Sequence, residues 1–179
     1  MTPDAGDDRQ TVVLDTPRGR VTAMDSAYDV RPGNRDRDVV VNASYSGVLP
    51  ARFVGRHRPR GAIGVDCAIG LDGAGIAGLW FLEALEIPAA AADVGNVVLG
   101  DGVAMYEHGV VSRVNAIAAA MGVAPGDPVR DAARVLLERD LAPAAAEDVT
   151  NRTVMATGPA GRAVVCTDSI AFGRPEDRG

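Results

Sequence analysis

Three short apolar segments alternate with two helical segments in the middle of this 179-residue chain. Asp38–Ala43 and Ala62–Ile69 have the nearly uninterrupted apolar character of strands that are buried on both faces, and Pro88–Asp93 is a third candidate. Between them, the patterns of Val48–His57 and Ile76–Glu86 predict helices. A strand–helix–strand–helix–strand order of this kind predicts a parallel sheet covered by helices.

A hairpin is expected at each end of this region. Thr11–Leu14 and Val21–Met24 lie on either side of a turn that contains proline and glycine. Thr153–Thr157 and Arg162–Ile170 flank a Gly–Pro–Ala–Gly sequence in the same way. Each arrangement is typical of two antiparallel strands joined by a tight turn.

Two more helices are expected before the second hairpin. The first is predicted by apolar residues that share one helical face, namely Val110, Val114, Ile117, Ala118 and Met121. Asp127 and Pro128 predict the start of the second, because a carboxylate caps free amides and proline fits the first helical turn. Pro143 is expected to end that helix.

Together these elements predict an α/β fold: a single three-layer domain with a mostly parallel sheet, plus the N-terminal and C-terminal β-hairpins. We expect this domain to span residues 11–172, with a disordered N-terminus over residues 1–10 and a disordered tail over residues 173–179. The chain is 47% hydrophobic, which suits a protein with a core of its own.

All 18 basic residues are arginine, so the chain has no lysine. This excludes Schiff-base catalysis, pyridoxal-phosphate anchoring and a Walker-type phosphate loop, which all need the lysine amine. The net charge of −6 counts against binding to nucleic acid or to an anionic membrane surface. We expect no organic cofactor, and no metal because the sequence has no recognised metal-ligand spacing. The expected partner is a small-molecule substrate.

Cysteine usage and the N-terminal sequence indicate a compartment. Cys67 and Cys166 lie far apart with no CxxC spacing, so neither a disulfide framework nor a zinc site is expected. Residues 1–10 are polar and acidic, unlike a signal peptide, and no stretch has about 20 uninterrupted apolar residues. We expect a cytoplasmic protein.

The first candidate site loop spans residues 42–47, since ligands of α/β sheets bind beyond the carboxyl ends of the strands. Ser44 has the position of a nucleophile at a strand-to-helix turn, and the chain order Ser44, Asp101, His108 is the one that α/β-hydrolases use. Tyr45 and Ser46 would contact the substrate. The alternative is that Ser44 and Ser46 only cap the helix that follows.

The second candidate loop begins with Asp66 and Cys67. Asp66 and Asp72 could form a carboxylate pair that supplies acid and base, and Cys67 could be the nucleophile as a thiolate. The alternatives are a carboxylate that caps the loop and a cysteine that fills the core.

A GxGxxG string follows in the same loop, formed by Gly73, Gly75 and Gly78, with Asp93 near the spacing of a ribose-binding acid. It would hold a dinucleotide. The alternative is that these glycines allow a turn and close helix–strand packing.

The third candidate loop runs from Asp93 to His108. Asp101, together with Arg113 and Asn115 just inside the expected helix, would contact the substrate, and Arg113 would bind a carboxylate or phosphate. The adjacent aromatic residues Trp80 and Phe81 widen the apolar face of their helix, which favours either a homo-oligomer interface or a deeply buried helix.

Several of these segments resemble a small bacterial family of stand-alone α/β proteins: Asn42–Gly47, Val65–Ile76, Leu99–Asp101 and Val111–Asn115. The resemblance implies a site at these segments and no named activity. The chain has Tyr45 where the family pattern has a histidine, and Cys67 where a smaller residue is usual.

The function that the sequence favours is a small cofactor-independent enzyme of hydrolase or lyase type, which acts on a small polar substrate at the carboxyl ends of the strands. Ser44 or Cys67 would be the nucleophile, with Asp66 and Asp72 as acid and base. The alternatives are a dinucleotide-binding oxidoreductase and a non-catalytic oligomeric ligand-binding protein.

Overall fold

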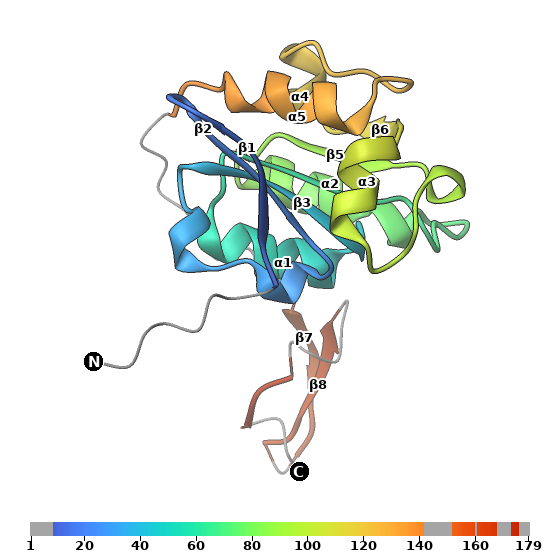
Figure 1. The fold of residues 1–179 in the computed structure, drawn as a ribbon. Coiled ribbons are helices and arrows are strands. Elements are labelled where there is room, and N and C mark those ends of the chain that lie inside the picture. The colour runs from blue at the N-terminus through green and yellow to red at the C-terminus, as the bar shows by residue number, and fades with distance from the viewer. Residues whose placement is uncertain (1–8, 142–151, 160, 168–172, 176–179) are drawn as a thin grey trace. The chain divides into compact units, whose positions relative to one another are not determined.

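A computed structural model describes residues 9–141, 152–159, 161–167 and 173–175 (Figure 1). The chain divides into two compact units, Met1–Ala146 and Glu147–Gly179. We describe each unit by itself, and the single domain over residues 11–172 stays a prediction. The expected role of Pro143, and most of both expected disordered ends, lie outside the described residues.

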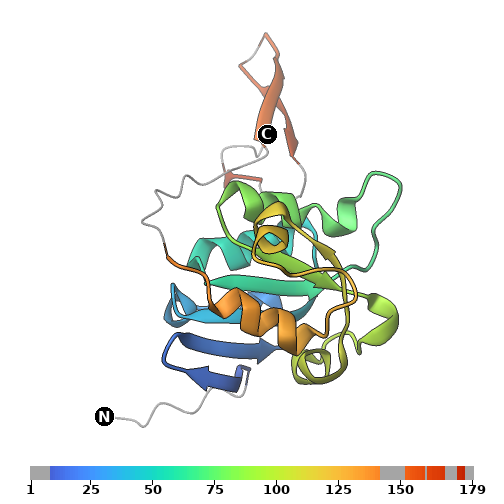
Figure 2. The same cartoon turned by 90° about the horizontal axis from the view of Figure 1, so that it is seen from above.

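The first unit contains a mixed six-stranded sheet in the order β1-β2-β3-β4-β5-β6. The four central strands are parallel, whereas β1 and β6 pair antiparallel at the two edges. Figure 2 shows the sheet from a second direction. Its strands are β1 Thr11–Thr16, β2 Gly19–Met24, β3 Asp38–Tyr45, β4 Gly61–Val65, β5 Ala89–Ala92 and β6 Val111–Val114.

Five α-helices and four short 3₁₀ turns accompany this sheet in the described part of the unit. The helices are α1 Val48–His57, α2 Gly78–Ala84, α3 Gly102–His108, α4 Ala116–Ala120 and α5 Val129–Leu137. The 3₁₀ turns are η1 Ala27–Asp29, η2 Pro32–Asn34, η3 Ala74–Ile76 and η4 Val94–Asn96. The α/β class is as the sequence predicts, and α1 has the predicted bounds.

Alternation along the central strands divides the apolar side chains between two packing regions. Val39 and Val41 of β3 belong to the main core, where they lie with Leu136 of α5. Asn42 of β3 and Ala62 of β4 instead line a pocket with residues of α1 and α2. The main core also includes Val21, Ala43, Ile63, Val65, Ala90, Ala92, Met105, Val111, Ala118, Val123, Val129, Ala132, Ala133 and Leu137.

The helix expected over residues 110–121 is wrong. Val111–Val114 is the edge strand β6, which pairs with β5, and only Ala116–Ala120 is helical. Asn115 separates the two, because its side chain caps α4 through the amide of Ala118. The free edge of β5 provides a pairing partner that a helix over this segment would leave unused.

Three smaller expectations also need correction. β4 ends at Val65 rather than Ile69, since Ala68 has a left-handed φ of 55°. Asp127 does not cap α5: its carboxylate accepts the Ala124 amide, and Pro128 is the N-cap residue. The stretch from Asp93 to His108 is not a plain loop, because it contains η4 and α3.

Asp38 is the centre of a buried polar network that the sequence did not reveal. Its two carboxylate oxygens accept both guanidinium N–H groups of Arg20, at 2.9 and 2.8 Å. Oδ2 also accepts the Thr22 hydroxyl at 3.1 Å and the Asn34 amide at 2.7 Å. The Asp38 side chain is fully buried, so this set of donors compensates for the removal of its charge from water.

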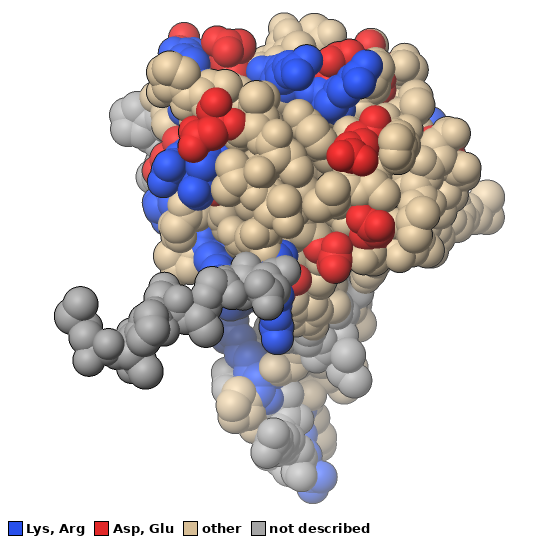
Figure 3. Space-filling model, viewed as in Figure 1, with Lys and Arg blue, Asp and Glu red and all other residues tan. Residues whose placement is uncertain are grey.

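The second unit contains β7 Arg152–Thr157 and β8 Ala163–Thr167, which pair antiparallel. Cys166 is exposed on β8. No helix in the described ranges has the length and hydropathy needed to cross a membrane. On the face seen in Figure 3, acidic and basic side chains are mixed rather than gathered by sign.

Candidate functional site

Asp66 is the first residue after β4, at the carboxyl end of the parallel strands. It is only 7% exposed. Its Oδ2 accepts the Ser112 hydroxyl at 2.5 Å, and its Oδ1 accepts the Val94 amide at 2.8 Å. The expected loop-capping role is therefore present, together with a hydroxyl partner from β6.

Asp66 differs from Asp38 in how many further hydrogen bonds its oxygens can accept. Among the described residues, each oxygen of Asp66 has a single donor, whereas the Asp38 oxygens share four donors between them. A carboxylate has about four lone-pair positions. Asp66 therefore keeps capacity for a further donor at the edge of the sheet where ligands of α/β proteins bind.

The sequence does not reveal that Ser112 is a partner of Asp66. The two lie 46 residues apart, and the strand β6 brings them together. A helix over this segment would not have placed Ser112 opposite β5. The pair could have been predicted only if this segment had been recognised as an antiparallel edge strand.

Ser44 does not occupy a strand-to-helix turn, because it is still part of β3. Its Oγ accepts the Ala27 amide at 2.9 Å. The N-cap residue of α1 is Gly47, and no side chain caps that helix. The two expectations for Ser44, a nucleophile at the turn and a cap of α1, are both wrong about its position.

The expected partners of Ser44 are engaged elsewhere. Asp101 caps α3 by accepting the Ala104 amide at 2.8 Å. His108 is exposed, with Nε2 3.6 Å from a carboxylate oxygen of Glu107. The hydrogen bonds and ion pairs of the described residues thus join neither Asp101 nor His108 to Ser44.

Asp72 and Cys67 have separate surroundings. Asp72 is exposed and accepts the Ala74 amide at 3.1 Å, so its hydrogen bond goes to its own loop rather than to Asp66. Cys67 is half-buried, and burial, more than the nearby Asp66 carboxylate, raises the pKa of its thiol. This disfavours the thiolate on which nucleophilic attack depends.

The amides of the glycine string are already used within the chain. The amides of residues 74–78 donate to Asp72 Oδ1, Ile69 O, Gly73 O, Ala74 O and Ser46 O, in that order. Gly75 and Gly78 allow close backbone contact, since a Cβ on either would come within 2.4 Å of a carbonyl oxygen. Asp93 accepts the Gly95 amide and the Asn96 side chain. These contacts correspond to the packing alternative.

The two residues expected just inside a helix, Arg113 and Asn115, have different roles. Arg113 lies on β6 and donates to the neighbouring Ser112 carbonyl at 2.8 Å, so its predicted helical position is wrong. Asn115 is buried and bonded to Ala89, Ala118, Leu79 and Ile87, which leaves no capacity for a substrate.

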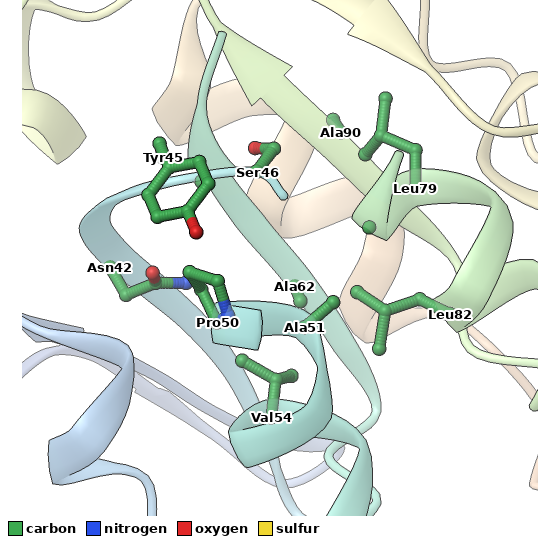
Figure 4. Close-up of a pocket in the computed structure, with 12 residues that line it drawn as sticks. Asn42, Tyr45, Ser46, Pro50, Ala51, Val54, Ala62, Leu79, Leu82 and Ala90 are labelled. Carbon is green, nitrogen blue, oxygen red and sulfur yellow. The ribbon is translucent and has the colours of Figure 1, made fainter. Parts of the chain in front are cut away.

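A small cavity of about 20 Å³ lies between α1, α2 and the sheet (Figure 4). Tyr45, Ser46 and Pro50 line it near the start of α1, and Leu79 and Leu82 line it from α2. Ser46 is 8% exposed. Among the described residues, Ser46 Oγ is the one buried side-chain oxygen or nitrogen without a hydrogen-bond partner.

Comparison of the chain with protein-family models, with curated proteins and with solved structures found no match. The resemblance to a small bacterial α/β family stays a prediction. Within the described ranges, no three His, Cys, Asp or Glu side chains are grouped so that they could hold a metal ion.

Proposed function

We propose that this chain is a small cofactor-independent enzyme of hydrolase or lyase type, which acts on a small polar substrate beside Asp66. The single observation that carries the proposal is the Asp66 carboxylate: it is buried, hydrogen-bonded to the Ser112 hydroxyl at 2.5 Å, and not saturated with donors. A buried group of this kind at the carboxyl ends of the strands is a candidate general base.

Asp66 takes the acid/base role in this proposal, and Ser112 is the hydroxyl that it can deprotonate. A hydroxyl within hydrogen-bond reach of a base is the arrangement that nucleophilic catalysis requires. Ser112 therefore replaces Ser44 as the preferred nucleophile, and Asp72 is not required. The dinucleotide alternative is less well supported, because the amides of the glycine string have acceptors within the chain.

We also propose that the first unit is a three-layer domain, with helices on both faces of the sheet and a hairpin formed by β1 and β2. The division of β3 and β4 side chains between the main core and the cavity supports this arrangement.

Trp80 is 56% exposed, which argues against the deeply buried helix and makes α2 the surface where we expect self-association.

The test is to incubate the protein with a mixture of small polar metabolites and to identify by mass spectrometry which one is consumed. We expect Asp66→Asn to reduce the rate of consumption at least 100-fold and Ser112→Ala to reduce it at least tenfold. Asp131→Asn is the matched control: Asp131 is half-exposed on α5 and pairs with Arg134, so this change should leave the rate unchanged. An Asp66→Asn variant with the original rate would exclude the proposed role.

A further inference from the structure

The first turn of α1 has amide groups without acceptors. A helix leaves its first amides without intrahelical partners, and here no side chain of the described residues caps them. The amides of Gly47, Val48 and Leu49 donate to no acceptor within the described residues. The first turn also contains no acidic residue. The positive end of a ten-residue helix is therefore available to an anion.

Ser46 adds an independent observation at the same place. Its hydroxyl is buried without a partner and lines the cavity next to Tyr45 and Pro50. Its backbone is held on both sides, because the Ser46 amide donates to Val65 O at 2.7 Å and its carbonyl accepts the Gly78 amide at 2.8 Å. Leaving a buried hydroxyl unpaired costs stability, so its retention points to a ligand that pairs with it.

The rest of the cavity is apolar. Val54 of α1 and Leu79 and Leu82 of α2 line it, together with Ala62 and Ala90 of the sheet (Figure 4). Its volume of about 20 Å³ is a little more than the roughly 10–15 Å³ that one water needs, so it has room for a group about the size of a methyl. A short aliphatic group fits such a lining better than a polar one.

We propose that Ser46 and the N-terminus of α1 bind the carboxylate of a small aliphatic acid, whose short carbon chain enters the cavity between α1, α2 and the sheet. Tyr45 would cover the bound group, since its ring packs against the Cα of Gly47.

Asp66 does not compete for this place. Its carboxylate is directed to Val94 and Ser112, on the β5–β6 side of β4, whereas Ser46 lies on the β3 side. This anion site does not rest on the proposed function. The binding site itself stands on Ser46 and α1.

The experiment uses butyrate, butyramide and inorganic phosphate as probes, with affinities measured by calorimetry on the full chain. We expect butyrate to bind at least tenfold more tightly than butyramide, because only butyrate carries the charge that the helix end favours. Ser46→Ala should weaken butyrate at least fivefold, and Ala62→Val should weaken it by reducing the cavity. Ser26→Ala is the matched control outside the cavity and should have no effect.

Equal binding of butyrate and butyramide, or an unchanged affinity in Ser46→Ala, would overturn the proposal. If phosphate binds more tightly than butyrate, and Ala62→Val leaves the affinity for phosphate unchanged, an aliphatic acid is not the ligand class. Ser46→Ala removes an unpaired hydroxyl, so it should fold at least as stably as the parent protein. Asp66→Asn separates the two proposals: it should keep butyrate binding while it loses turnover.

Discussion

The hydroxyl oxygen of Ser46 lies directly over the Cα of Gly64, so close that a Cβ on Gly64 would stand 2.6 Å from it. The same Cβ would lie 3.2 Å from the Ser44 carbonyl oxygen. Glycine at this position of β4 therefore leaves the space that the Ser46 side chain occupies. A larger residue has to displace the hydroxyl or bend the strand.

Gly64→Ala should lower the free energy of unfolding by about 1–3 kcal/mol, as expected for an overpacked core position. Urea unfolding measures this change. Gly33→Ala is the matched control, because nothing lies within 4 Å of a Cβ built on Gly33. The control should change stability by no more than about 0.5 kcal/mol. Equal effects of the two substitutions would show that Gly64 is not confined as described.

Asn115→Ala should destabilise the first unit by about 3 kcal/mol or more. It leaves the Ala89 and Ala118 amides, and the Leu79 and Ile87 carbonyls, without their buried partner. Thermal unfolding measures the loss. Asn96→Ala is the comparison, since Asn96 bonds at the exposed surface and its removal should cost less than about 1 kcal/mol. If Asn115→Ala lowers stability no more than Asn96→Ala does, the hydrogen bonds of Asn115 do not stabilise the first unit.

The two cysteines should differ in reactivity. Burial raises the pKa of the Cys67 thiol, and Cys166 is exposed. Iodoacetamide reacts with the thiolate, so at pH 7.5 we expect Cys67 to be alkylated at least fivefold more slowly than Cys166. The rate at Cys67 should keep rising at higher pH. Peptide mass spectrometry follows both sites in one sample, and faster labelling of Cys67 would restore it as a nucleophile candidate.

His57 should make stability depend on pH. Burial, with Arg56 and Arg35 nearby, lowers the pKa of His57 below its ordinary value of 6.5. The unfolded chain then binds a proton before the folded chain does. The stabilising contribution is therefore complete above about pH 6.5 and is lost as the pH falls toward the folded-state pKa.

The check on this prediction is urea unfolding of the parent protein and of His57→Gln across pH 5 to 8. The free energy of unfolding of the parent protein minus that of the variant should be constant at pH 7 and above. This difference should decrease at lower pH, because the parent protein loses the contribution of neutral His57. A difference that does not change with pH would contradict the assignment to His57.

The parallel centre of the sheet could be predicted because its signal is local. Asp38–Ala43 carries a run of valines, and Val48–His57 has helical spacing bounded by turn residues, so short windows of sequence suffice. The edge strand β6 could not be predicted in the same way. Val114, Ile117 and Met121 fit a helical face by their spacing, and only the open edge of β5 decides that the segment begins as a strand.

The sequence predicts where the candidate site lies, but not which residues contact one another there. Asp66 follows a buried strand, which is a local signal for the carboxyl end of the sheet. Its contact with Ser112 depends on a pairing across 46 residues, and the unpaired hydroxyl of Ser46 depends on the packing of α1 against α2. Long-range contacts of this kind leave no periodicity in the sequence.

The strand order has a consequence for how the protein emerges from the ribosome. Because β1 to β6 follow one another in the sheet as they do along the chain, each strand can pair with the one released just before it. The core side chains Val39, Val41 and Ile63, however, pack with α5, which begins only at Val129. A nascent chain that ends before α5 would expose an apolar sheet face, and this is the interval in which a chaperone or premature aggregation would act on it.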